Sequence, residues 1–309
     1  MESAVGVEIE DAADGANLRR RGPWRQAAGR FRRKKLGLAA LGVLLFIFLV
    51  GLLAQALAPY DAGHEFLEFI NKPQPPGTPH HILGTDVIGH DFATQLIYGI
   101  RESVVSSLVC AAGATLIGTL VGVFAGYYGG PLDALLTWVS STIFAVPAVA
   151  ILLIVVIFSH WPVTPTVFGF WLMLYLWPGI ARVVRGSFTS LKSREYVEAA
   201  HAAGASDLRI IFRHLLPNSI GPLIVAGTSL VGQSIIVVAT VDFLGLGTVQ
   251  AEKPTLGSLI ADAARGTGFT PAPWFLYVFP AIALVLMLVC VNFIGDTLDE
   301  ALNPQARRV

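Results

Sequence analysis

Asp242 is the residue whose type and position most clearly suggest chemistry, because it lies in an otherwise apolar run from 222 to 247. An acidic side chain within a membrane span costs about 2.5 to 3.5 kcal/mol on insertion scales, so it is usually kept for a function. We predict that Asp242, together with Gln233 and Ser234, lines a pathway for a solute. The alternative is that Asp242 lies near the membrane surface and caps a turn beside Gly245.

The sequence offers little material for enzymatic chemistry. A Walker A loop places a glycine directly before its lysine, and none of the five lysines follows a glycine. The pair His64-Glu65 lacks the second histidine of a zinc-protease helix. Cys110 and Cys290 lie in separate apolar runs, which argues against a disulfide framework or a thiolate metal cluster. We therefore expect no catalytic residues, no metal site and no cofactor in this chain.

A polar stretch that begins at Ser193 is typical of two short helices. Ser193 is predicted to cap the first helix, and Gly204 to end it in the left-handed conformation. Ser206 or Asp207 is predicted to cap the second helix, and Pro217 to stop it. An apolar stripe is expected along one face of the second helix, formed by Leu208, Ile211, Phe212 and Leu215. Such a pair of helices can dock into a soluble partner, or can simply connect two membrane spans.

Several motifs show a family resemblance. One pattern in this stretch resembles the EAA loop of permease subunits in ATP-binding-cassette (ABC) importers. It consists of Glu198-Ala199-Ala200, three residues, Gly204, ten residues and then Leu215-Leu216-Pro217. Three further motifs are similar to those of the oligopeptide, dipeptide and nickel branch. They are Gly84-Thr85-Asp86 with Gly89 and Asp91, Phe243-Leu244-Gly245-Leu246-Gly247, and Asn292 with Gly295 and Asp296. The resemblance is to the C-type permease of that branch.

The resemblance implies a type I ABC importer permease fold and a set of partners. These are a second permease subunit, two cytoplasmic ATPase subunits that hold ATP and Mg²⁺, an extracytoplasmic substrate-binding protein and membrane lipid, with no nucleic acid. The resemblance also implies ATPase coupling through Glu195, Glu198, Ala199, Ala200, Gly204, Ala205, Asp207, Arg213 and Pro217. Three residues depart from the branch's usual pattern: His90 replaces an arginine, Val238 a glutamate, and Asp242 a serine.

The overall composition indicates an integral membrane protein. Of the 309 residues, 54% are hydrophobic and only 14% are charged, and the mean hydropathy is +0.65. A soluble domain carries about 25% charged residues. Six apolar runs are long enough to cross a bilayer as helices. They are residues 36 to 58, 102 to 126, 132 to 159, 166 to 184, 222 to 247 and 274 to 295. We therefore expect an all-α polytopic fold with about six transmembrane helices, or seven elements if the third run breaks at Pro147.

The basic residues predict the orientation of these spans, because cytoplasmic loops collect Lys and Arg. Nine lie between residues 19 and 35, six between 182 and 213, and two at 307 and 308, which together are 17 of the 21. We therefore expect a multi-pass protein of the bacterial cell membrane with both termini cytoplasmic. The expected parts are a cytoplasmic segment 1–35, a first transmembrane helix 36–58, an outer loop region 59–101, a permease core 102–296 with the EAA loop at 185–221, and a cytoplasmic tail 297–309.

The function favoured by the sequence is therefore import of di- or oligopeptides by an ATP-driven complex in which this chain forms half of the pathway. An importer for nickel, glutathione or another small solute is the first alternative. A gradient-driven secondary transporter is less favoured, because apart from Asp242 few ionisable residues lie within the spans. A membrane-embedded hydrolase is disfavoured by the missing zinc motif.

Overall fold

The computed structural model describes residues 23–158, 164–245, 254–265 and 272–302, and in this part the chain is all helical. The helices before residue 193 are α2 (Pro23–Arg33), α3 (Lys35–Leu52), α4 (Ala54–Leu57), η1 (Leu67–Phe69), α5 (Phe92–Tyr128), α6 (Gly130–Ala145), α7 (Ala148–Phe158) and α8 (Pro165–Lys192). The remaining helices are α9 (Glu195–Ala202), α10 (Asp207–Ile210), the π turn η2 (Ile211–Leu215), α11 (Leu216–Phe243), α12 (Leu256–Arg265) and α13 (Phe275–Leu302).

Five of these helical stretches are long and apolar enough to span a membrane. They are Lys35–Leu52, Phe92–Tyr128, Pro165–Lys192, Asp207–Phe243 and Phe275–Leu302. The third predicted span is not one helix but two, α6 and α7, which separate at Val146-Pro147. Proline disfavours the helical conformation in the residue before it, and Val146 is extended with φ −88° and ψ 130°. The expectation of six helical runs is thus met by five continuous helices and one broken helix.

The predicted ends of the spans differ from the observed ones, mostly because the helices are longer. α5 begins at Phe92, not at 102, because the Asp91 carboxylate accepts a hydrogen bond from the Thr94 amide and caps the helix there. α8 continues to Lys192 and α13 to Leu302, past the expected ends at 184 and 295. Hydropathy locates the apolar part of a helix, whereas polar turns extend the same helix beyond it.

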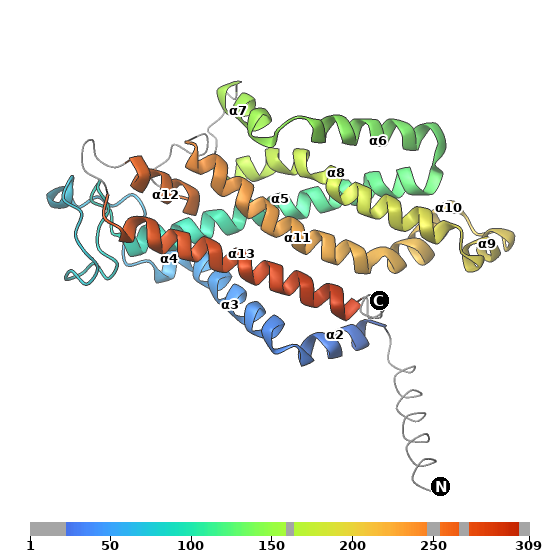
Figure 1. Cartoon of the computed structure of the whole chain (residues 1–309), viewed down its shortest axis with the longest axis horizontal. Coiled ribbons are helices and arrows are strands. Elements are labelled where there is room, and N and C mark those ends of the chain that lie inside the picture. Colours follow the sequence, from blue (N-terminus) through green and yellow to red (C-terminus); the bar gives the residue numbers. More distant parts are fainter. Residues whose placement is uncertain (1–22, 159–163, 246–253, 266–271, 303–309) are drawn as a thin grey trace, which may run out of the picture.

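The core of the bundle lies where α5, α8 and α11 pack together, with α13 and α3 beside them (Figure 1). The helices α5 and α8 pack with their backbones close together. Gly118, Gly122 and Gly126 lie one turn apart on α5, and each faces the backbone of α8 without an intervening side chain. At one end of the bundle lie α12 and the loops between α4 and α5, and α9 and α10 lie at the opposite end.

Candidate functional site

The segment between α8 and α11 forms a small projection at one end of the bundle (Figure 1). In its first helix, α9, Val197 is buried and Ala200 is partly buried against the core, whereas Glu195, Glu198 and Ala199 are exposed. The Glu198-Ala199 surface is therefore available to another molecule in this structure.

The cap predicted at Ser193 is wrong. Ser193 is the C-cap of α8, and its hydroxyl donates to the Ser190 carbonyl rather than to α9. The residue before α9 is Arg194, which has no side-chain cap. The helices α8 and α9 follow each other almost directly. The local sequence pattern therefore could not distinguish a serine that ends α8 from a serine that begins α9.

The turn predicted at Gly204 is confirmed. Gly204 has φ +79°, and its amide donates to the His201 carbonyl at 2.9 Å while the Ala205 amide donates to the Ala200 carbonyl at 3.0 Å. This pair of hydrogen bonds is a Schellman motif, which satisfies the last carbonyls of α9. Ala205 is partly buried against the core, so the turn directs the chain back toward the bundle.

The second helix of the segment does not stop at Pro217. It begins at Asp207 behind the N-cap residue Ser206, whose side chain makes no capping bond, and passes through the π turn into α11. A proline inside a helix loses one backbone bond and crowds the preceding turn. The carbonyl that the ring would crowd belongs to position 213, four residues earlier, and this position lies within the wider π turn at 211–215.

The predicted apolar stripe is divided between two faces. Ile211 and Leu215 are fully buried in the core, whereas Leu208 and Phe212 are each 61% exposed. Ile211 and Leu215 anchor the segment to the bundle. Leu208 and Phe212 therefore remain at the surface, where Arg213 and Pro217 are exposed as well.

A connection missed by the sequence analysis fixes this segment to the end of α5. The Tyr127 hydroxyl donates to Asp207 Oδ1 at 2.8 Å and lies 3.5 Å from His201 Nε2. Lys192 Nζ donates to the Tyr127 carbonyl at 2.6 Å. The sequence alone gives no sign of this connection, because the partners of Tyr127 lie 65 to 80 residues further along the chain. The segment is therefore joined to α5 as well as to α8 and α11.

The three residues predicted for the pathway do not share a face. Ser234 is buried and donates to the Ser107 carbonyl of α5 at 3.2 Å, whereas Gln233 is exposed. Asp242 is 4% exposed and accepts a hydrogen bond from the Thr255 hydroxyl at 2.6 Å. This bond ties the end of α11 to the start of α12 and supports the alternative role for Asp242. Its pathway role stays a prediction.

The motif at residues 84–91 forms a tight turn in the loop between α4 and α5. Asp86 accepts hydrogen bonds from the His90 amide at 2.8 Å and from the His90 ring at 2.9 Å. Asp91 pairs with His81 at 2.9 Å and also caps α5. A side chain at Gly89, where φ is +96°, would strike the Phe66 carbonyl. The motif therefore builds the loop and the start of α5.

This geometry predicts a pH-dependent stability of the loop between α4 and α5. The hydrogen bond with Asp86 raises the pKa of His90 against the opposing effect of burial, with help from the charges of Asp86, Glu65 and Asp262. A histidine whose pKa is raised on folding stabilises the folded state. This stabilisation is fully present below the ordinary histidine pKa of about 6.5, and it is lost as the pH rises through the higher pKa of the folded state. We expect the thermal midpoint of the purified protein to fall over that range. In His90→Gln that fall should be smaller.

His64→Gln is the matched control, since His64 is exposed and forms no ion pair among the described residues. Its pH profile should follow the wild-type one. Equal profiles for His90→Gln and the wild type would contradict the role of His90.

Comparison with known proteins identifies the family. Residues 118–308 match the family model of the binding-protein-dependent transport system inner membrane component. The chain belongs to this family. Residues 22–76 of the permease also match the N-terminal TM domain of oligopeptide transport permease C.

Three similar proteins are named as permease proteins of transport systems, and each match covers at least 90% of both chains. The permease is 36% identical over 281 residues to the oligopeptide transport system permease protein OppC of Mycobacterium tuberculosis, covering 90% of this chain and 93% of the relative. It is 32% identical over 287 residues to the glutathione transport system permease protein GsiD of Pectobacterium atrosepticum, with 93% of each chain covered. It is 32% identical over 285 residues to the dipeptide transport system permease protein DppC of Alkalihalophilus pseudofirmus, covering 92% and 91%.

A solved structure has the same fold. A chain of the MetNI methionine ABC transporter, described as inward facing, superposes with a TM-score of 0.56 at 20% identity, covering 69% of this permease and 98% of that chain. The permease is thus the C-type transmembrane subunit of an ABC importer. It works with ATPase subunits, which bind the nucleotide, and is not itself an ATPase.

Proposed function

We propose that this permease forms half of an import pathway for peptides, either di- or oligopeptides or the peptide-like solute glutathione. The support is that relatives at 32% to 36% identity over at least 90% of the chain carry those three names. Nickel or another small solute is the alternative within the same class of importer.

We further propose that the α9 end of the bundle is cytoplasmic and docks into an ATPase subunit, with a second permease beside this one and an extracytoplasmic binding protein at the opposite end. The concentration of basic residues in the segments 19–35, 182–213 and 307–308 supports this orientation in the bacterial cell membrane. The observation that carries the coupling role is the exposed Glu198-Ala199 surface on a segment anchored by Tyr127 and Asp207.

The test is Glu198→Lys in the complete importer, reconstituted in proteoliposomes with the second permease, the ATPases and the binding protein. We expect ATP-driven uptake to fall about tenfold or more, because reversing a charge in a desolvated interface costs about 2 kcal/mol or more. Stimulation of ATP hydrolysis by the loaded binding protein should be lost, while insertion of the permease into the membrane should be normal.

Asp299→Lys is the matched control, because Asp299 is exposed near the end of α13, outside the segment between α8 and α11, and carries the same charge. Its uptake should be unchanged. Uptake by the wild type that needs no ATP would favour a gradient-driven transporter, and uptake of Ni²⁺ in place of all peptides would exclude the peptide substrate.

A further inference from the structure

A polar pocket lies between α5 and the loop that follows α4, at the end of the bundle opposite α9 (Figure 1). It has a volume of about 480 Å³, within the range of about 300 to 1,000 Å³ that is usual for pockets that hold small molecules. The lining consists of residues 61–64 of the loop and of Tyr98, Arg101 and Glu102 of α5, and most of it is polar. The coupling and pathway residues discussed above do not contribute to it.

Hydrogen bonds hold the loop over α5 at this pocket. The Gln95 side chain donates from Nε2 to the Ala62 carbonyl at 2.6 Å, and the His64 amide donates to the Asp61 carbonyl at 3.0 Å. Gln95 and Glu102 are seven residues apart on α5 and therefore lie on the same face of the helix. The pocket is thus part of the folded chain and not a gap between loose segments.

Glu102 is the residue of the pocket that points to a ligand. It is 9% exposed, and its carboxylate makes no hydrogen bond or ion pair within the described residues. The neighbouring Arg101 likewise has no carboxylate partner in this part of the chain, and the Tyr98 hydroxyl has no hydrogen bond there. A buried charge without a partner is costly. We therefore expect this pocket to hold groups that compensate both charges.

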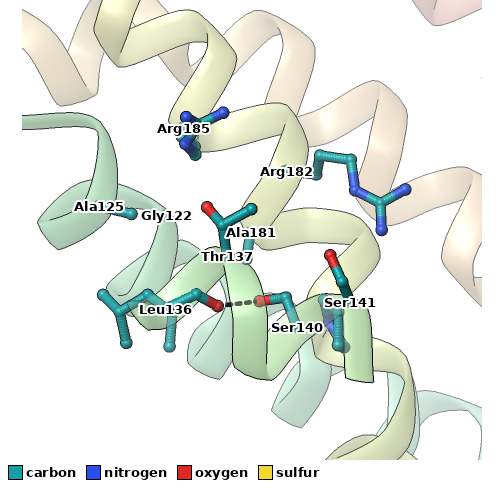
Figure 2. A pocket seen from close by; sticks show the side chains of 11 residues that line it. Gly122, Ala125, Leu136, Thr137, Ser140, Ser141, Ala181, Arg182 and Arg185 are labelled. Carbon is teal, nitrogen blue, oxygen red and sulfur yellow. Dashed lines mark hydrogen bonds between the residues drawn. The ribbon is translucent and has the colours of Figure 1, made fainter. Parts of the chain in front are cut away.

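Another pocket with charged residues differs in this respect. Between α5, α6 and α8 (Figure 2), the Arg185 guanidinium donates to both carboxylate oxygens of Asp133. Arg182 lies over the Phe144 ring, with its Cζ 5.1 Å from the centroid. Both arginines thus have partners within the chain, and that pocket gives no indication of a ligand.

The charges of the pocket at Glu102 favour a zwitterion. Arg101 would repel a simple cation bound at Glu102, whereas Glu102 and the exposed Asp61 would repel a simple anion bound at Arg101. An ammonium group can donate hydrogen bonds to the Glu102 carboxylate while an anionic group accepts them from the planar guanidinium of Arg101. The expected ligand therefore carries both groups in one small unit.

The sequence and the structure together place this pocket at a membrane surface. Neither residues 36–60 nor residues 103–132 contain a charged side chain, and both stretches border the pocket. The helices α3 and α5 lie side by side here, since a Cβ at Gly51 would be 3.1 Å from the Arg101 Cα. Two uncharged spans thus end at the same level, which is the depth at which phospholipid headgroups lie.

The surface beside the pocket distinguishes a lipid from a dissolved zwitterion such as a peptide. Leu49, Leu52 and Leu53, next to Gly51 at the end of α3, are exposed. This apolar surface adjoins the polar pocket and can contact the acyl chains of a phospholipid whose headgroup lies in it. A dissolved peptide has no acyl chain and makes no use of such a surface.

We propose that this pocket binds the headgroup of an aminophospholipid, phosphatidylethanolamine. The ammonium group lies at Glu102, and the phosphodiester accepts hydrogen bonds from Arg101 and from the Tyr98 hydroxyl. The site fixes one lipid at the junction of α3, α5 and the loop between α4 and α5. It does not depend on which solute the importer transports.

The test titrates dioctanoyl phosphatidylethanolamine into the complete importer in detergent and measures the thermal midpoint, which a ligand of the folded state raises. We expect a larger rise than with dioctanoyl phosphatidylcholine, whose methylated ammonium has no N–H donor. In Glu102→Gln the affinity for phosphatidylethanolamine should fall about tenfold and the preference over phosphatidylcholine should be lost. Arg101→Gln should weaken the binding of both lipids, because both carry the phosphodiester.

Glu68→Gln is the matched control, because Glu68 is exposed in the same loop and does not line the pocket. Its response to both lipids should equal that of the wild type. Equal responses of the wild type to the two lipids, or an unchanged preference in Glu102→Gln, would overturn the proposal.

A measurement on the wild type keeps the proposal testable if Glu102→Gln is poorly folded. A carbodiimide joins a carboxylate to a primary amine in contact with it as an amide. In vesicles that contain phosphatidylethanolamine, this reagent should attach the lipid to Glu102, as located by mass spectrometry after proteolysis. Attachment confined to carboxylates outside the pocket would contradict the proposed site.

Two further outcomes would assign the pocket to another partner and overturn the proposal. A rise of the midpoint with dialanine that Glu102→Gln abolishes would assign the pocket to the transported solute. Loss of co-purification with the second permease in Glu102→Gln, with the lipid preference unchanged, would assign Glu102 to the interface between the subunits.

Discussion

Gly122→Val is expected to prevent α5 and α8 from packing and to remove most of the permease from the membrane. A Cβ at this position would lie 2.6 Å from the Ala181 carbonyl oxygen and 2.7 Å from the Val184 Cβ. Neither contact is relieved by turning a side chain, because one atom belongs to the backbone and the other is the branch point of a packed valine. Membrane helices use small residues to bring their backbones this close.

We expect Gly122→Val to lower the free energy of unfolding by about 3 kcal/mol or more. This is the upper end of overpacking effects, because two further methyl groups follow the Cβ. The measurement is the amount of permease in isolated membranes together with its thermal midpoint in detergent. The matched control is Gly186→Val, which lies on α8 with no atom within 4 Å of its Cβ. Equal abundance and equal midpoints for the two variants would show that the α5–α8 contact is looser than described.

The packing of α5 illustrates what the sequence could and could not predict. The existence of the span follows from its apolar composition, and the small residues Gly118, Gly122 and Gly126 recur at the spacing of a close helix contact. What the sequence does not contain is the partner: Trp177, Ala181 and Arg185 of α8 lie opposite these positions only after both helices have folded. The start of α5 was also missed, because it depends on the Asp91 cap and not on hydropathy.

The segment between α8 and α11 shows the same division between local and non-local information. The turn at Gly204 was predictable because a left-handed residue after an alanine-rich helix is a local requirement. The division of the apolar stripe was not, because the choice of which stripe residues face the core depends on how the segment packs against the rest of the bundle. The bond from Tyr127 to Asp207 joins residues 80 apart, and the bond from Thr255 to Asp242 joins a helix to a loop. Only the folded chain reveals such pairs.

Gly204→Val is expected to abolish most ATP-driven uptake while the permease remains inserted at normal abundance. At φ +79° an L-residue with a Cβ pays about 1 to 2 kcal/mol, and a β-branched residue more. The chain would escape this cost by rotating the turn or unwinding the end of α9. Either change breaks the bonds from the Gly204 and Ala205 amides to α9 and moves Glu198 relative to Asp207. The measurement is uptake and stimulated ATP hydrolysis in the reconstituted importer.

Gly204→Asn separates the conformational cause from simple crowding. Asparagine tolerates the left-handed conformation better than valine, and no atom lies within 4 Å of a Cβ at position 204. Asparagine should therefore retain most uptake, with alanine between asparagine and valine. The order asparagine, alanine, valine would show that the φ angle of the turn transmits the force from the ATPase. Equal losses for asparagine and valine would instead mean that the position is covered by the ATPase in the complex, so that contact and not backbone angle decides coupling.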